Sequence, residues 1–159
     1  MPNQPTLPDL LCNGLDVAFV GINPSVFSAT QGHYFARKIN RFWPAFTRSR
    51  LSIPARKGLG VEQLLPEHDR LLQEYGFGFT DLVKRASPRS TDLTQNEPKD
   101  GVDALARKLK RFKPRFACFH GVTVGRPVQK TIAPDAPEIG LGLQPYTIGE
   151  TCIFVVTTP

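Results

Sequence analysis

Asn23 is the polar residue of this sequence best placed to do chemistry on a bound molecule. It follows an apolar run at 17–20, Val-Ala-Phe-Val, whose length and composition are typical of a buried strand. Gly21 permits a tight backbone path, and Pro24 keeps Asn23 out of the helical region and prevents simple continuation of the strand. The amide is therefore expected at the carboxyl end of a strand, where ligand sites form in open parallel α/β sheets. The alternative is that Asn23 only forms a turn before the proline.

Two stretches after Asn23 carry groups that suit contact with nucleic acid. Residues 31–35, Gln-Gly-His-Tyr-Phe, form a predicted loop with two aromatic rings. Residues 37–43, Arg-Lys-Ile-Asn-Arg-Phe-Trp, mix cations with aromatics, as suits a surface that meets phosphates and bases together. Between Asp16 and Glu62 the chain has seven basic residues and no acidic one, and its net charge is +6. This distribution favours a polyanionic partner.

The motifs of the chain resemble those of the mismatch-specific uracil/thymine DNA glycosylases, a branch of the uracil-DNA glycosylase superfamily. The matching stretches are Gly-Ile-Asn-Pro at 21–24, Phe-Ala at 35–36, Asn-Arg-Phe-Trp at 40–43, Gly-Phe-Thr at 78–80, Leu-Val at 82–83, Lys-Pro-Arg at 113–115 and Gly-Leu-Gln-Pro at 142–145. They follow the order of the family and cover nearly the whole chain.

The resemblance implies roles for individual residues. Asn23 would orient the attacking water, because an amide carbonyl can hold a water by a hydrogen bond although it is a poor general base. Phe35 would stack on a base flipped out of the duplex, and Ile22 and Ser28 would contact that base. Asn40 would hold the loops of the pocket. The predicted DNA contacts are Arg37, Lys38, Arg41 and Thr80.

The function implied by this resemblance is that of a monofunctional DNA glycosylase that initiates base excision repair. It would excise uracil from mispairs with guanine in double-stranded DNA, and thymine and ethenocytosine stay open as further substrates. Such an enzyme would need no cofactor and is expected to act as a monomer. It would work inside the cell, in the cytoplasm or nucleoid of a bacterium or the nucleus of a eukaryote.

Two other classes of protein stay open. A non-catalytic module that binds mismatched or damaged DNA would tolerate the loss of Asn23. A small-molecule nucleotide or nucleobase enzyme would bind without the steep salt dependence that phosphate contacts give. Against this second class, neither GxGxxG nor GxxxxGK[ST] occurs in the sequence.

Length and composition set further bounds. At 159 residues, the chain is long enough for one domain with a sizeable core. We see neither a secretory signal nor an apolar stretch near the roughly 20 residues that a membrane helix requires. The three cysteines lie far apart and the histidines lack metal-ligand spacing, so we predict no disulfide framework and no metal site. His120 follows a predicted strand and is a candidate general base, but the sequence shows no residue that would orient its ring for this role.

The expected elements alternate between strands and helices. Strands are predicted at 17–20, 76–80, 116–119 and 153–156, helices at 40–50, 66–75, between 100 and 114 and within 121–131, loops at 52–60 and 87–99, and a loose arm at 1–8. This alternation predicts an α/β three-layer sandwich with a central, mainly parallel four-stranded sheet flanked by helices. We expect one glycosylase domain over 1–159. Because a loop and a final helix follow the last strand in the family, we expect this domain to be truncated at its C-terminal end.

Overall fold

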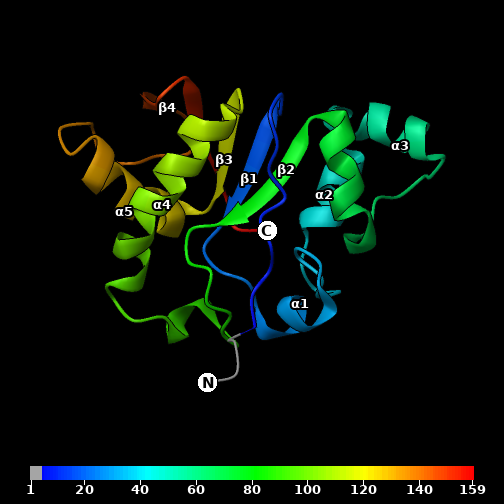
Figure 1. Cartoon of the computed structure of the whole chain (residues 1–159), viewed down its shortest axis with the longest axis horizontal. Coiled ribbons are helices and arrows are strands. Elements are labelled where there is room, and N and C mark those ends of the chain that lie inside the picture. The colour runs from blue at the N-terminus through cyan, green and yellow to red at the C-terminus, as the bar shows by residue number, and fades with distance from the viewer. Residues whose placement is uncertain (1–4) are drawn as a thin grey trace.

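A five-stranded sheet forms the centre of the computed structural model, which describes residues 5–159 (Figure 1). The strands are β1 (Val17–Gly21), β2 (Phe77–Asp81), β3 (Phe116–His120), β4 (Gly142–Ile148) and β5 (Thr151–Val156). Their spatial order is β2-β1-β3-β5-β4, in which only the β4–β5 pair is antiparallel. The predicted α/β class with a mainly parallel sheet is confirmed. The predicted count of four strands is wrong, because β4 adds a fifth.

The unpredicted strand β4 forms one edge of the sheet. Its sequence contains Gly142 and Pro145, both of which are rare inside strands. Proline has no N–H to donate to a strand ladder, so it is tolerated chiefly at edges. Pro145 is exposed, and the pairing with β5 is irregular between Leu143 and Thr147. The edge position explains how a strand forms in a stretch for which the sequence predicted no element.

Helices cover both faces of the sheet (Figure 1). The helical segments are α1 (Val26–Gln31), α2 (Phe42–Arg48), α3 (Ile53–Leu59), α4 (Glu97–Phe112) and α5 (Val122–Ile132), with 3₁₀ segments η1 (Arg50–Ser52), η2 (Pro66–Tyr75) and η3 (Ser90–Asp92). Helices α4 and α5 pack on one face, and α2, α3 and η2 pack on the other. No helix in the described part of the chain is long and apolar enough to cross a membrane.

The side chains of β1 alternate between two cores, as the pleat of a strand requires. Ala18 and Val20 lie in the core beneath α4 and α5. Phe19 faces the opposite way, into an aromatic core that also contains Phe42 and Phe79. Strand β1 is therefore buried on both faces, which matches the continuous apolar run in its sequence.

Two local predictions are wrong. The stretch 52–60, predicted as a loop, contains α3, which ends at Gly60 in the left-handed conformation with φ of 69°. Only Ala55 is buried within α3, so the sequence shows no apolar periodicity. The predicted arm at 1–8 begins at residues outside the described range. Its described part is packed, because Leu7 is buried and the following Leu10 pairs with Phe79 of β2.

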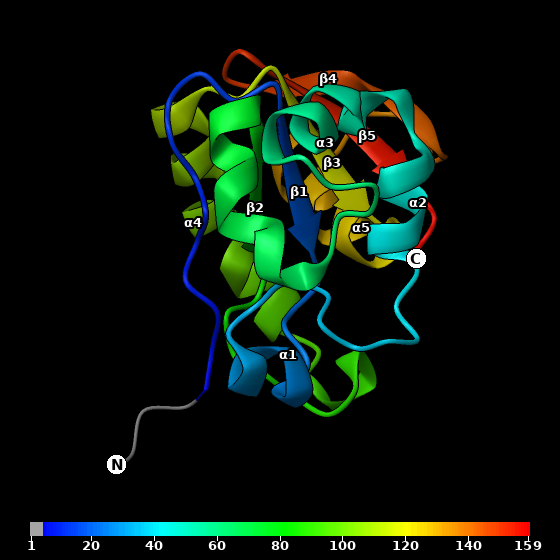
Figure 2. The same cartoon turned by 90° about the vertical axis from the view of Figure 1, so that its right-hand side faces the viewer.

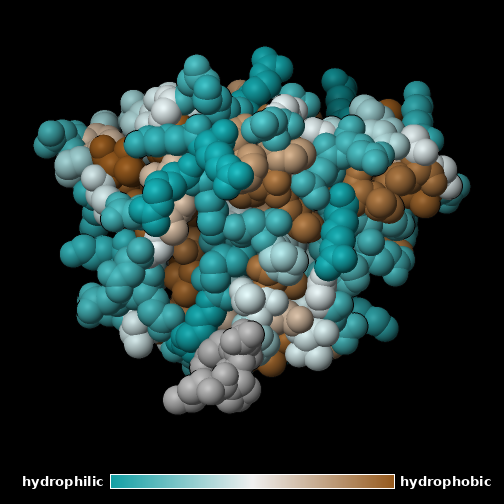
Figure 3. Space-filling view, viewed as in Figure 1, coloured by the Kyte–Doolittle hydropathy of each residue, from teal (hydrophilic) through white to brown (hydrophobic). Residues whose placement is uncertain are grey.

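The carboxyl ends of the parallel strands meet at one edge of the sheet, and α1 lies beyond this edge (Figure 2). Most of the surface in Figure 3 is hydrophilic, and the hydrophobic side chains on that face form separate patches. Because ligand sites in parallel α/β sheets form at the carboxyl ends of the strands, we expect a site at this edge of the sheet.

Candidate active site

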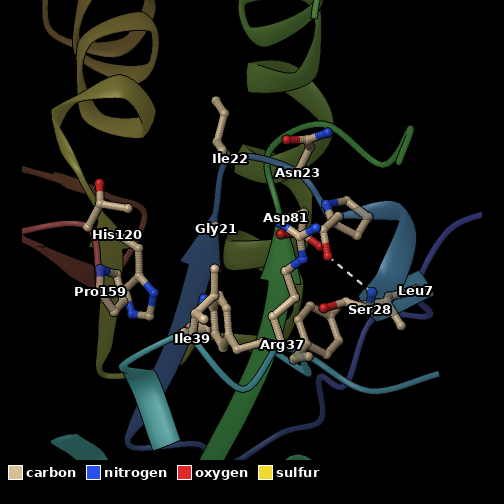
Figure 4. A pocket seen from close by; sticks show the side chains of 16 residues that line it. Leu7, Gly21, Ile22, Asn23, Ser28, Arg37, Ile39, Asp81, His120 and Pro159 are labelled. Atoms are coloured by element: carbon tan, nitrogen blue, oxygen red, sulfur yellow. Dashed lines mark hydrogen bonds between the residues drawn. The ribbon is translucent and has the colours of Figure 1, made fainter. Parts of the chain in front are cut away.

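A cavity of about 290 Å³ opens at the carboxyl ends of β1, β2 and β3. Its volume lies just below the range of roughly 300–1,000 Å³ that ligand pockets span, so it suits a single small ring. The cavity brings together six of the residues singled out from the sequence: Ile22, Asn23, Ser28, Phe35, Arg37 and Asn40. Figure 4 labels Ile22, Asn23, Ser28 and Arg37 among them. Asp81 and His120, the last residues of β2 and β3, line it as well.

The side-chain amide of Asn23 has a fixed orientation. Its Nδ2 donates to the carbonyl oxygen of Arg85 at 2.9 Å and to Oγ of Ser87 at 2.8 Å. A carbonyl only accepts, and the Ser87 hydroxyl donates onward to the carbonyl oxygen of Arg89, so the nitrogen must face these groups. Oδ1 of Asn23 has no hydrogen-bond partner among residues 5–159. It is thus available to accept a hydrogen bond from a water in the cavity.

The loop that carries Phe35 is held from both sides. Oδ2 of the buried Asp69 accepts from the backbone N–H of Tyr34 at 2.9 Å, and Oδ1 lies 3.1 Å from Nδ1 of His33. Nε1 of Trp43 donates to the carbonyl oxygen of Tyr34 at 2.9 Å. Both backbone polar groups of Tyr34 are therefore fixed, directly before Phe35.

Phe35 itself adopts the left-handed conformation, with φ of 53°. This conformation is unfavourable for a bulky side chain and is found mostly where the surrounding structure enforces it, often at functional sites. The ring stacks on His120, with centroids 5.1 Å apart and 27° between the planes. It also packs against Phe42, and the centroids of these two rings are 4.7 Å apart. The aromatic wall of the cavity is thus continuous with the core.

Ser28 and Asn40 both hold backbone groups beside the cavity. Oγ of Ser28 accepts from the backbone N–H of Ala36, which ties α1 to the residue after Phe35. Oδ1 of Asn40 accepts from the backbone N–H of Phe42 at the start of α2. Ser28 is buried and Asn40 is half-buried. Their observed bonds fix the shape of the loops around the cavity.

The three predicted DNA-contacting cations, Arg37, Lys38 and Arg41, are all exposed. None of them takes part in the ion pairs found within residues 5–159. Arg37 lines the cavity. Arg41 lines a neighbouring, more apolar groove of about 680 Å³ that crosses the outer face of β1, β3 and β5.

Thr80 lies elsewhere, and its predicted contact with the DNA backbone is contradicted. The residue is fully buried in β2, and its hydroxyl donates to Oδ1 of Asp9 at 2.6 Å. A side chain with no accessible surface and an occupied hydroxyl cannot reach a phosphate. Its role is to tie the N-terminal segment to the sheet.

Two titratable residues at the cavity have perturbed pKa values because they are buried. Burial lowers the pKa of His120 to about 4, and Nδ1 of this ring has no hydrogen-bond partner among the described residues. His120 is therefore neutral at physiological pH. Burial raises the pKa of Asp81 to about 7, although the nearby Lys84 opposes the shift. Within the described residues, His, Cys, Asp and Glu form no group of three that could hold a metal.

Sequence reasoning missed three residues that shape this site: Asp69, Asp81 and Ser87. Ser87 lies in the stretch predicted as a surface loop, yet it is 2% exposed. Asp69 lies on η2, where Leu72 is the other buried residue, and nothing in its local sequence distinguishes it from the exposed Glu67 and Glu74. The sequence position of Asp81 could have indicated its role. Asp81 directly follows the strand predicted at 76–80, just as Asn23 closely follows the strand predicted at 17–20.

Comparison with known proteins finds a family and a relative for this chain. The family model described as the uracil DNA glycosylase superfamily matches residues 8–159. The chain belongs to this superfamily. It is also 30% identical to the G/U mismatch-specific uracil DNA glycosylase of Schizosaccharomyces pombe, in an alignment that covers 94% of this chain and 45% of that protein. The chain thus spans less than half the length of this relative.

Membership of the uracil DNA glycosylase superfamily confirms the family resemblance inferred from the motifs. The matched range includes every residue that lines the cavity from β1, α1 and the Phe35 loop. The Gly-Ile-Asn-Pro motif ends β1, and the Asn-Arg-Phe-Trp motif leads into α2. Three of the matching stretches, at 21–24, 35–36 and 40–43, therefore contribute residues to the cavity, although they are separated in the sequence.

Proposed function

We propose that this chain is a DNA glycosylase that hydrolyses the bond between uracil and deoxyribose when uracil is mispaired with guanine in double-stranded DNA. The observation that carries the proposal is the orientation of Asn23, whose Nδ2 is held by Arg85 and Ser87 while Oδ1 is left for a water at the cavity. The choice of mispair is supported by the Schizosaccharomyces pombe relative, a G/U mismatch-specific uracil DNA glycosylase.

In the proposed reaction the target base leaves the duplex and enters the cavity. Flipping costs a few kcal/mol, and the cost is lowest for a mispaired base, which by itself favours mismatches. Phe35 stacks on the flipped base, while its own ring is supported by His120 and Phe42. The size of the cavity favours a pyrimidine.

Asn23 Oδ1 then accepts a hydrogen bond from the attacking water and aims its oxygen at the sugar carbon C1′. The bond between C1′ and the base breaks with its electron pair on the base, so the sugar becomes cationic and the base leaves as an anion. Ile22 lines the cavity, and in the proposed reaction its backbone N–H hydrogen-bonds the pyrimidine edge of the leaving base. The products are free uracil and an abasic site, and no cofactor is consumed.

The DNA duplex would lie across the carboxyl edge of the sheet, where Arg37, Lys38 and Arg41 are exposed. Their charges would neutralise phosphates on either side of the flipped nucleotide. We propose that the chain acts as a single domain and a monomer inside the cell, where its DNA substrate is found. Thymine and ethenocytosine opposite guanine are the further bases to test.

The test is release of base from G·U, A·U and G·T duplexes by the wild-type chain and by Asn23→Ala, with enzyme in excess over DNA. Release that is fastest from G·U and lost in Asn23→Ala supports the proposal. We expect the variant to bind the G·U duplex within about tenfold of wild type, or roughly 1.4 kcal/mol. Binding of the G·U duplex without release by wild type would favour a non-catalytic mismatch-binding module instead.

A further inference from the structure

Asp81 is the one acidic residue that lines the cavity in the described part of the chain, and it has no role in the reaction proposed above for Asn23 and Phe35. It is the last residue of β2 and pairs in register with Gly21 of β1. Asn23 follows two residues after Gly21, so Asp81 and Asn23 reach the cavity from neighbouring strands (Figure 4).

The space above Gly21 is occupied by the Asp81 carboxylate. A Cβ atom at Gly21 would lie 2.7 Å from Oδ1 of Asp81 and 3.7 Å from Cε1 of Phe35. The absence of a side chain at Gly21 therefore lets the carboxylate and the stacking ring approach the same point of the backbone. This point lies in the wall of the cavity where the flipped nucleotide is proposed to sit.

The Asp81 carboxylate has one long ion pair, with Lys84, and this pair lacks hydrogen-bond geometry. Oδ2 of Asp81 is buried without a hydrogen-bond partner among residues 5–159, and Nζ of Lys84 is 3.9 Å away. Lys84 instead lies 2.8 Å from Oδ1 of Asp9, whose Oδ2 is 2.7 Å from Lys108. Lys84 and Lys108 favour the ionised form of Asp81, whereas Asp9 and above all burial oppose it.

These features together suit a general base. A carboxylate with a pKa near 7 is ionised in a large fraction of molecules at physiological pH and still accepts a proton effectively. Burial also excludes bulk water from the group, which strengthens its interactions inside the cavity. An amide such as Asn23 can orient a water but cannot take its proton.

We propose that Asp81 is a second catalytic residue, the general base that accepts a proton from the water that Asn23 orients. The inference rests on the proposed glycosylase function. The water oxygen bonds to C1′, the bond from C1′ to the base breaks with its electron pair on the base, and one water proton passes to a carboxylate oxygen of Asp81. Solvent then protonates the uracil anion and deprotonates Asp81, so the enzyme returns to its starting state.

The experiment compares wild type, Asp81→Asn and the control Asp103→Asn in single-turnover release of uracil from a G·U duplex between about pH 5.5 and 8.5. Asp103 is an exposed acid of α4. We expect Asp81→Asn to slow release by about 10²- to 10⁴-fold at pH 7.5, the range typical of a lost general base. The wild-type and control rates should rise with pH up to about 7 and then level off, whereas the Asp81→Asn rate should be flat.

Binding to a duplex with a non-hydrolysable 2′-fluoro analogue of deoxyuridine opposite guanine separates chemistry from affinity. Wild type and Asp81→Asn should bind it within about threefold of each other. The proposal is overturned if Asp81→Asn releases uracil at close to the wild-type rate with the same pH profile while wild type is active. If wild type releases no base from any duplex, the glycosylase function itself fails and the role of Asp81 fails with it.

Discussion

Nδ2 of Asn23 lies 2.8 Å from Oγ of Ser87, a residue 64 positions later in the chain. The backbone of Ser87 runs beside the same motif, since its N–H donates to the carbonyl oxygen of Pro24 and its carbonyl oxygen accepts from Val26. The segment after β2 therefore holds both the backbone and the side chain of the Asn23 motif. The orientation of the amide depends on this distant segment as much as on the motif itself.

We predict that Ser87→Ala slows uracil release by about 10- to 100-fold without unfolding the chain. The variant keeps the backbone bonds to Pro24 and Val26 but removes one of the two groups that hold Nδ2 of Asn23, and small misplacements of catalytic groups cost rate to this extent. Single-turnover release and thermal unfolding measure the two effects. The exposed Ser90 provides the control, and equal rates for Ser87→Ala and Ser90→Ala would contradict the prediction.

Phe35 gives a prediction about strain and stacking. Phe35→Ala and Phe35→Gly both remove the ring and should both impair base release. The left-handed backbone at φ of 53° costs about 1–2 kcal/mol for a residue with a Cβ and nothing for glycine. Urea unfolding should therefore find the glycine variant more stable than the alanine variant by about 1 kcal/mol. Greater stability of the alanine variant would mean that the loop relaxes once the ring is removed.

The buried Asp69 is predicted to position the aromatic loop. Asp69→Ala leaves the N–H of Tyr34 without its acceptor, and a lost hydrogen bond to a buried charged group costs about 1.5–3 kcal/mol. We expect this loss in urea unfolding, together with weaker capture of the flipped base. Glu67→Ala, an exposed change on the same 3₁₀ segment, is the control. Unchanged base release in a destabilised Asp69→Ala variant would show that the loop geometry does not depend on this carboxylate.

The sequence predicted the parts of the site that local patterns determine. Asn23 was found because an apolar run, a glycine and a proline surround it, and Phe35 because it lies in a matched motif. Asp69 and Ser87 were missed because their roles depend on contacts with distant parts of the chain. Asp69 contacts Tyr34, which lies 35 positions earlier, and Ser87 contacts Asn23, which lies 64 positions earlier. Thr80 was misplaced for the same reason, since its burial depends on the N-terminal segment that supplies Asp9.

The fold was predicted in class but not in every element. Strands β1 and β2 are buried on both faces, and β3 and β5 are buried on one face, but all four carry apolar runs that are visible in the sequence. Strand β4 is an edge with a proline, and α3 buries only Ala55, so neither has a periodic apolar pattern. These elements are stabilised by pairing and packing with neighbouring parts of the chain rather than by a local apolar pattern.

Arg41 gives a prediction about DNA binding. Arg41→Ala should weaken binding of the G·U duplex and reduce the slope of log affinity against log salt by about one, since one phosphate contact is lost. Arg111→Ala is the matched control. It is an exposed arginine at the C-terminal end of α4. This end of α4 lies near the amino ends of the parallel strands, far from the cavity, because Lys110 packs beside Gly149 in the turn before β5. Equal salt slopes for the two variants would place the DNA elsewhere on the surface.

Asp81 gives a prediction about stability that is independent of catalysis. Its pKa rises from 3.8 in an unstructured chain to about 7 in the folded protein because the carboxyl is buried. Below pH 3.8 the group is protonated in both states and has no effect. As the pH rises from there to 7, the unfolded chain ionises while the folded chain stays protonated, so Asp81 increasingly destabilises the fold. Above pH 7 the carboxyl is ionised in both states, and the destabilisation of the fold by Asp81 stays at its full value.

Asp81→Asn should therefore stabilise the protein relative to wild type, and by more at pH 8 than at pH 5. Between these two values the advantage should grow by about 2–3 kcal/mol, since each pKa unit corresponds to about 1.4 kcal/mol. Urea unfolding of both proteins at the two pH values measures it, and effects of all other groups cancel in the difference. An advantage that shrinks as the pH rises would mean that Asp81 is ionised and paired in the fold, and that its carboxylate is not held ready to take a proton.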